Sequence, residues 1–112
     1  MSIRMTKPWQ ALTNDNAARL SGQLGAYQLG DDKGTVVLIG FAGGRSLFGL
    51  RGVLMDWAAA PPAGATQFRC EVNTQYQTRY RELLMLHVAD HGALPLHNQA
   101  DPPANLGRLS PL

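Results

Sequence analysis

The order of predicted elements indicates an α+β domain in which a small three-stranded sheet, antiparallel or mixed, is flanked by helices. Two strand-like segments are joined by a short polar turn, and two amphipathic helices follow with a third strand-like segment between them. The 112 residues are 45% apolar and 16% charged, which excludes a disordered or coiled-coil chain. We therefore expect one folded domain at 25–98, with an N-terminal extension at 1–24 and a proline-containing tail at 99–112.

The first elements are a short helix and a hairpin. A helix is predicted at 13–21, where Asn14 or Asp15 can cap the first turn. Strands are predicted at 25–29 and 35–40, and the charged, glycine-containing residues between them are typical of a hairpin tip. The second of these segments is β-branched and nearly all apolar, so we expect a central strand that is buried on both faces.

The next helix is expected between a glycine-rich loop and a pair of prolines. Ser46 follows the loop and can cap the helix. The apolar residues from Leu47 to Trp57 recur at helical spacing, which places them on one face of the helix. The helix is expected to end before Pro61, because proline cannot continue it.

The last strand and the last helix complete the domain. Residues 66–72 alternate between apolar and polar, so this strand is expected to direct Glu71 away from the core. Thr74 and Gln77 have the spacing of a capping box and open a long helix, which Gly92 ends. The expected fold is therefore a layer of helices against a small sheet.

Charge and cysteine content limit the partners and the compartment. Ten basic and eight acidic side chains give a net charge of +2, which permits an anionic partner without a polybasic surface. Cys70 is the single cysteine, so no internal disulfide can form and a reducing, cytoplasmic setting is expected. The most apolar run, 36–44, is about half of the ~18 residues that indicate a membrane span. No association with a membrane is expected.

Five features follow one another along the chain in a recognisable order. Gly25-Ala26-Tyr27 lies on the first predicted strand and Leu38-Ile39-Gly40 on the second, with ten residues between the triplets. Arg51 lies on the next helix, Glu82 on the last helix and Asn98 beyond it. This pattern resembles the GIY-YIG nuclease superfamily, whose members carry two such triplets on a hairpin, followed by an arginine, a glutamate and an asparagine.

The resemblance implies a divalent-metal-dependent endonuclease, a hydrolase that cleaves phosphodiester bonds in DNA. It implies that Glu82 holds Mg²⁺ or Mn²⁺, that Arg51 clamps the phosphate, that Tyr27 lies near the nucleophile and that Asn98 supports them. Arg45 remains an alternative to Arg51, because a two-residue expansion in the preceding loop leaves open which arginine corresponds to that of the family.

The sequence departs from the family at two positions that carry chemistry. Leu38 stands where the second triplet normally begins with tyrosine, and Phe41 stands where lysine is common. Both residues are apolar and could extend the core across the site. The alternative is therefore a catalytically inactive domain of the same fold that binds nucleic acid or a protein partner, a homodimer being compatible with its small size.

Arginine side chains outside the motif are candidates for nucleic-acid binding. Arg69, Arg79 and Arg81 are predicted to form a phosphate-binding flank, and Arg45 to hold a backbone phosphate at a helix N-terminus. The competing interpretation is that these are solvated arginines. Glu82 lies three residues after Arg79, so a helix ion pair explains it as readily as a metal does.

Two further patterns suggest ligand binding, but a purely structural role is the better explanation of each. His87 and His91 stand four residues apart on one helix, as in many metal sites, but a metal needs more ligands, His97 and Cys70 could join only through the fold, and no glutamate follows His87 as in the zinc-protease motif. The glycine-rich loop at 40–44 precedes a helix but lacks the Gly-Lys-Ser/Thr ending of a nucleotide-binding loop.

Overall fold

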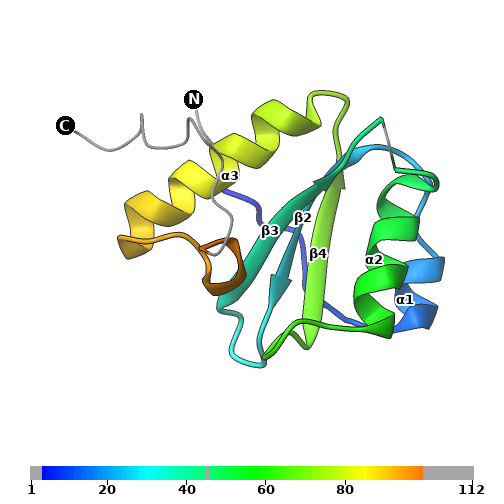
Figure 1. Cartoon of the computed structure of the whole chain (residues 1–112), viewed down its shortest axis with the longest axis horizontal. Coiled ribbons are helices and arrows are strands. Elements are labelled where there is room, and N and C mark those ends of the chain that lie inside the picture. The colour runs from blue at the N-terminus through cyan, green and yellow to red at the C-terminus, as the bar shows by residue number, and fades with distance from the viewer. Residues whose placement is uncertain (1–3, 45, 100–112) are drawn as a thin grey trace.

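The fold has three layers, with a central sheet between helices on its two sides. The computed structural model describes residues 4–44 and 46–99. Figure 1 shows the sheet edge-on, with α1 (Asn14–Ala18) and α2 (Gly49–Ala59) on one side and α3 (Tyr76–His91) on the other. The expected α+β class is confirmed. The predicted tail lies almost entirely outside the described residues.

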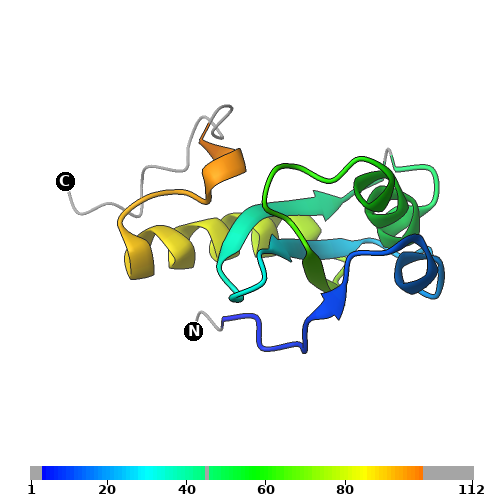
Figure 2. The same cartoon turned by 90° about the horizontal axis from the view of Figure 1, so that it is seen from below.

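The sheet has four strands, one more than the sequence predicts. They run in the order β1 (Gln10–Ala11), β4 (Gln67–Val72), β2 (Gly25–Gly30), β3 (Val36–Ala42), and every pairing is antiparallel. The missed strand, β1, is only two residues long and too short to produce an alternating pattern. Figure 2 shows the N-terminal segment passing along β4 before it reaches α1. The predicted N-terminal extension therefore contributes a strand.

β3 lies at an edge of the sheet and not at its centre, which corrects the expectation from its apolar sequence. The central position belongs to β2, which pairs with β3 and β4. The outer side of β3 is covered by a short 3₁₀ turn, η1 (Leu96–Asn98). Asn98 is 7% exposed, and its side-chain oxygen accepts from the Ile39 N–H at 2.8 Å while its amide nitrogen donates to the Ile39 carbonyl at 2.9 Å. Because η1 covers the outer side of β3, this strand can be apolar although it lies at an edge of the sheet.

Alternation along β2 divides the core into two clusters, one on each side of the sheet. Tyr27 and Leu29 point toward α1 and α2, whereas Ala26 points toward α3. The cluster on the α2 side contains mainly the following residues: Ala17, Tyr27, Leu29, Leu38, Leu50, Leu54 and Phe68. The cluster on the α3 side contains Met5, Ala26, Ile39, Leu83 and Leu84.

The helices begin at other residues than predicted, and of the three α-helices in the described residues only α1 has a side-chain cap. α1 is capped by Thr13, whose hydroxyl accepts from the Asn16 N–H at 3.2 Å. α2 begins three residues after Ser46, at Gly49, whose φ of +59° and close approach to Gly22 exclude a side chain.

The long helix α3 begins at Tyr76 without a side-chain cap, so the predicted capping box of Thr74 and Gln77 does not start it. Instead Asn73 accepts from the Gln75 N–H at 2.8 Å and shapes the turn that leads into the helix. Gly92 ends the helix in the left-handed conformation, as predicted. Among the helices of the described residues, none combines the length and the apolar character needed to cross a bilayer.

Candidate functional site

Tyr27 is buried against the α2 side of the sheet. Its side chain is 5% exposed, and its ring crosses Gly40 so closely that a Cβ there would lie 2.3 Å from the phenolic oxygen. The hydroxyl accepts a hydrogen bond from Trp57 Nε1 at 2.8 Å. Burial raises the pKa of Tyr27 to about 12, although the bond from Trp57 acts in the opposite direction. The phenol is therefore neutral at neutral pH and ill suited to act as a base.

Arg51 lies on the same side of the sheet, near the start of α2. Its guanidinium sits beside the loop that precedes β2, where a Cβ added at Gly22 would be 3.7 Å from Nη2. Arg45, the alternative candidate, lies outside the described residues.

Glu82 lies on the opposite side of the sheet, on α3, where it shares one guanidinium with Glu71. Arg79 bonds both oxygens of Glu71, at 2.9 and 3.1 Å, and also pairs with Glu82 Oε1. The expectation that Glu71 points away from the core is wrong, because α3 covers that face and places Arg79 against it. Burial lowers the pKa of Arg79, but the hydrogen bonds and charges of the two carboxylates raise it further, so the net shift is upward.

The residues around Glu82 do not fit the Mg²⁺ or Mn²⁺ site that the resemblance implies. A divalent cation needs free carboxylate oxygens, and here Arg79 already supplies the positive charge between Glu71 and Glu82. Within 4–44 and 46–99, no group of three or more histidine, cysteine, aspartate or glutamate residues could hold a metal ion. We derive no catalytic step through a metal.

The four residues predicted to form a catalytic site are thus distributed over three places. Tyr27 and Arg51 belong to the α2 side, Glu82 belongs to the α3 side, and Asn98 is bonded to the edge of β3. The polar groups of Tyr27, Glu82 and Asn98 each have a hydrogen-bond partner that explains their position.

The predicted phosphate-binding flank is not a continuous surface. Arg69 lies on β4, its guanidinium 4.3 Å from the centre of the Trp9 ring. The side chain of Arg79 is only 11% exposed, and Arg81 is exposed on α3. These three arginines therefore do not present their charges together.

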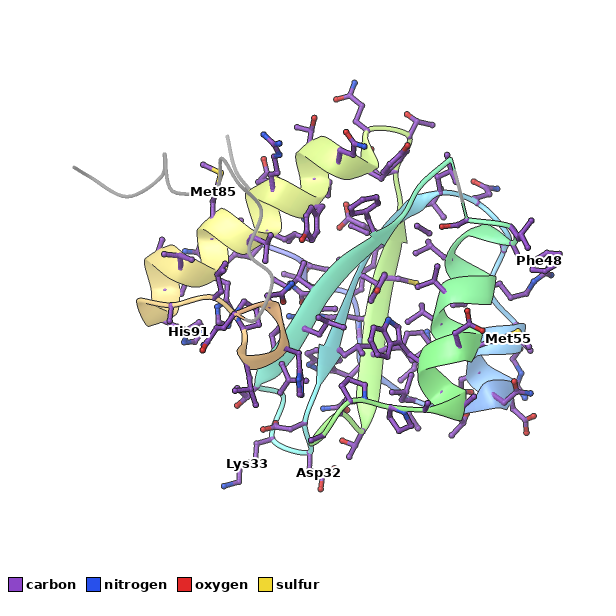
Figure 3. All side chains as sticks on the ribbon, in the orientation of Figure 1. Asp32, Lys33, Phe48, Met55, Met85 and His91 are labelled. Carbon is purple, nitrogen blue, oxygen red and sulfur yellow. The ribbon has the colours of Figure 1, made fainter. Side chains whose placement is uncertain are left out.

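The outer surface of α2 has a feature that the sequence reasoning missed. Leu47 and Phe48, just before the helix, are 90% and 60% exposed. Figure 3 shows Phe48 and Met55 on the side of α2 that faces away from the sheet. These side chains belong to a surface hollow of about 590 Å³ with the following lining: Ser46, Leu47, Phe48, Gly52, Val53, Met55 and Asp56.

A second hollow adjoins the first. It has a volume of about 390 Å³ and is lined by Tyr27, Val53, Asp56, Trp57 and Ala60. Because Val53 and Asp56 line both hollows, we treat the two as one surface, the α2 groove.

The sequence contained a signal for the α2 groove. Leu50 and Leu54 are buried against the sheet, yet the same segment also carries Phe48, Val53 and Met55. That is more apolar surface than the single stripe a helix needs for packing against one sheet. Val53 and Met55 are partly buried and also pack against the core, so the exposed part of this excess is Phe48 together with Leu47.

The fold and the α2 groove define a small α/β/α domain with an apolar surface groove, and its described residues contain no group of three or more metal-ligating side chains. The chain belongs to the family described as "Domain of unknown function (DUF7508)", whose model matches residues 1–90. No curated protein and no solved structure matches the chain. The matched residues include β1, α1 and the helices that cover the two faces of the sheet, apart from the last residue of α3.

Proposed function

We propose that this chain is a non-catalytic binding domain that holds an apolar segment of another protein in the α2 groove. The observation that carries the proposal is the pair of exposed side chains, Leu47 and Phe48, at one end of that groove. Large apolar side chains that are grouped at a hollow mark interaction surfaces more often than isolated ones do. The sequence left open a catalytically inactive domain that binds nucleic acid or a protein partner. The proposal keeps this alternative to the GIY-YIG nuclease and chooses the protein partner.

The shape of the α2 groove favours a segment with apolar anchors. The groove runs along one helix, and its two hollows have two side chains in common, Val53 and Asp56. Hollows placed along a helix suit alternate anchor side chains of an amphipathic or extended peptide. Trp57 lines one hollow and Phe48 the other, and aromatic side chains are enriched where partners bind tightly.

Asp56 limits the identity of the partner. It is exposed, lines both hollows, and has no ion-pair partner among the residues that the structure describes. An unpaired carboxylate between two apolar hollows attracts a cationic side chain and repels phosphate. The partner segment therefore carries a lysine or arginine between its apolar anchors, and nucleic acid is disfavoured at this surface.

A displayed random-peptide library selected against the whole chain tests the proposal. We expect enriched peptides to combine two apolar side chains with one lysine or arginine, and to lose most of their affinity for Phe48→Ser. Asp56→Asn should weaken binding by several-fold and reduce its salt dependence. Leu96→Ser is the matched control, because Leu96 is 61% exposed but lies in η1, outside the groove.

Three outcomes contradict the proposal. Peptides that lose as much affinity with Leu96→Ser as with Phe48→Ser would show nonspecific apolar adhesion. Salt-sensitive retention of DNA that is unaffected by Phe48→Ser, in the absence of selected peptides, would assign the domain to nucleic acid. A concentration-dependent dimer that Phe48→Ser dissociates would show that the groove receives a second copy of this chain.

A further inference from the structure

A further cavity, separate from the two hollows of the α2 groove, lies on the opposite side of the sheet, between β2, β4, α3 and the N-terminal segment. Its volume is about 100 Å³. Its polar lining consists of Arg4, Gln28, Arg69, His87, Asp90 and His91. We call it the Arg69 cavity. Figure 3 shows His91 at the end of α3, on the far side of the molecule from Phe48 and the α2 groove.

Among the residues that the structure describes, none provides a counter-ion for Arg69. Its Nε donates to Gln28 Oε1 at 2.7 Å, and its guanidinium lies against the Trp9 ring, so both contacts are with neutral groups. In the described ranges no carboxylate pairs with Arg69, and its terminal nitrogens donate to no acceptor. Burial accordingly lowers the pKa of Arg69. A half-buried guanidinium that keeps unused donors is a ready partner for an anion.

The remaining lining groups favour an anion as well. Asp90 is the only carboxylate among the lining residues, and Arg4 bonds both of its oxygens, at 2.7 and 2.6 Å. The acceptor of Gln28 is used by Arg69, which leaves its amide nitrogen as a donor. His87 Nδ1 donates to the Ala93 carbonyl at 2.9 Å, so Nε2 of the neutral ring is an acceptor and His87 contributes neither charge nor a donor. The fixed charge at the Arg69 cavity is therefore positive.

From this arrangement we infer that the Arg69 cavity is a binding site for a tetrahedral oxyanion, namely phosphate or the terminal phosphoryl group of a small metabolite. The guanidinium of Arg69 and the amide of Gln28 bind the oxygens from the floor of the cavity. The exposed side chains at its rim, Arg4 and His91, face the solvent from which the anion enters.

Titration of the whole chain with inorganic phosphate, at constant ionic strength set with chloride, tests this inference. We expect saturable shifts of the Arg69 side-chain NMR signal and of the Gln28 amide signals. Arg69→Gln should weaken binding by about tenfold or more, because it removes a charge-assisted contact. Arg19→Gln is the matched control, since it removes the same charge from an exposed position after α1, on the other side of the sheet.

A second variant and a second ligand complete the test. Gln28→Leu removes the amide donor without changing the net charge, so loss of binding in this variant excludes a purely long-range effect. A phosphate monoester such as glycerol 3-phosphate that shifts the same signals identifies a phosphoryl group, whereas binding of inorganic phosphate alone identifies the free anion. Shifts spread evenly over the exposed cationic residues, or equal weakening by Arg69→Gln and Arg19→Gln, would overturn the inference.

Discussion

The two sides of the sheet bury polar chemistry in opposite ways. On the α2 side, the phenol of Tyr27 and the indole of Trp57 form one neutral hydrogen bond within an apolar cluster. On the α3 side, Arg79 pairs with Glu71 and Glu82, and no carboxylate of the described residues pairs with Arg69. The residues that resemble a nuclease site are divided between these environments. Residues that match a motif in order along the chain therefore need not come together in space.

The largest effect is expected on the α2 side, from Gly40→Ala. The added Cβ would lie 2.3 Å from the phenolic oxygen of Tyr27 and would displace a ring that the surrounding core fixes. We expect a loss of about 2 to 3 kcal/mol in unfolding free energy, as for other overpacked cores. Urea denaturation measures it. Gly44→Ala is the control, because its nearest contact is an ordinary 3.8 Å; equal losses for both variants would refute the explanation.

A smaller effect is expected on the α3 side, from Arg79→Leu. This change leaves Glu71 and Glu82 facing each other without the cation that joins them. The side chains are partly exposed, so we expect about 2 kcal/mol and not the larger loss typical of a fully buried pair. Glu82→Gln, which keeps the pairing of Arg79 with Glu71, should cost less than about 1 kcal/mol. If Glu82→Gln proves the more damaging variant, the ion pair is not what holds α3 to β4.

The pH dependence of the α2 side provides a spectroscopic test. The folded protein holds the pKa of Tyr27 at about 12, above the ordinary value of 10.0. Folding therefore favours the neutral phenol, so this contribution to stability is complete below pH 10 and declines as the pH rises through 10 toward 12. Ultraviolet absorbance should show one phenolate forming late, and Tyr27→Phe should remove that component. A late component that persists in Tyr27→Phe would assign it elsewhere.

The smallest effect is expected in a DNA-cleavage assay, where we predict no cleavage. Because Arg79 already pairs with the Glu82 carboxylate, we expect single-stranded, duplex and branched DNA to remain intact in Mg²⁺ or Mn²⁺. Cleavage that is abolished by Glu82→Ala, with the fold intact by circular dichroism, would restore the nuclease prediction. Cleavage that survives this substitution would point to a contaminant or to another site.

Local patterns were sufficient to predict most of the elements. The hairpin of β2 and β3 depends on residues close together in sequence, and both long helices follow from apolar spacing. β1 escaped prediction because its partner, β4, lies more than fifty residues away. The edge position of β3 was not predicted for a similar reason, because Ile39 and the Asn98 that covers it are 59 residues apart.

The candidate site was less predictable than the fold. Tyr27, Arg51 and Glu82 lie on the expected types of element, but their proximity depends on which side of the sheet each helix packs against. Helix patterns do not specify that side. The same ambiguity concealed the partner of Glu71, whose exposure could be judged only once α3 was placed over it.

The contact between Asn98 and Ile39 also affects how the protein behaves in concentrated solution. Unpaired N–H and C=O groups on an edge strand can template pairing with other chains, the first step in fibril growth. The Asn98 amide occupies one such pair of groups at the middle of β3. A chain truncated before residue 98 would expose this edge, and we expect it to aggregate faster than the whole chain, as thioflavin fluorescence would report.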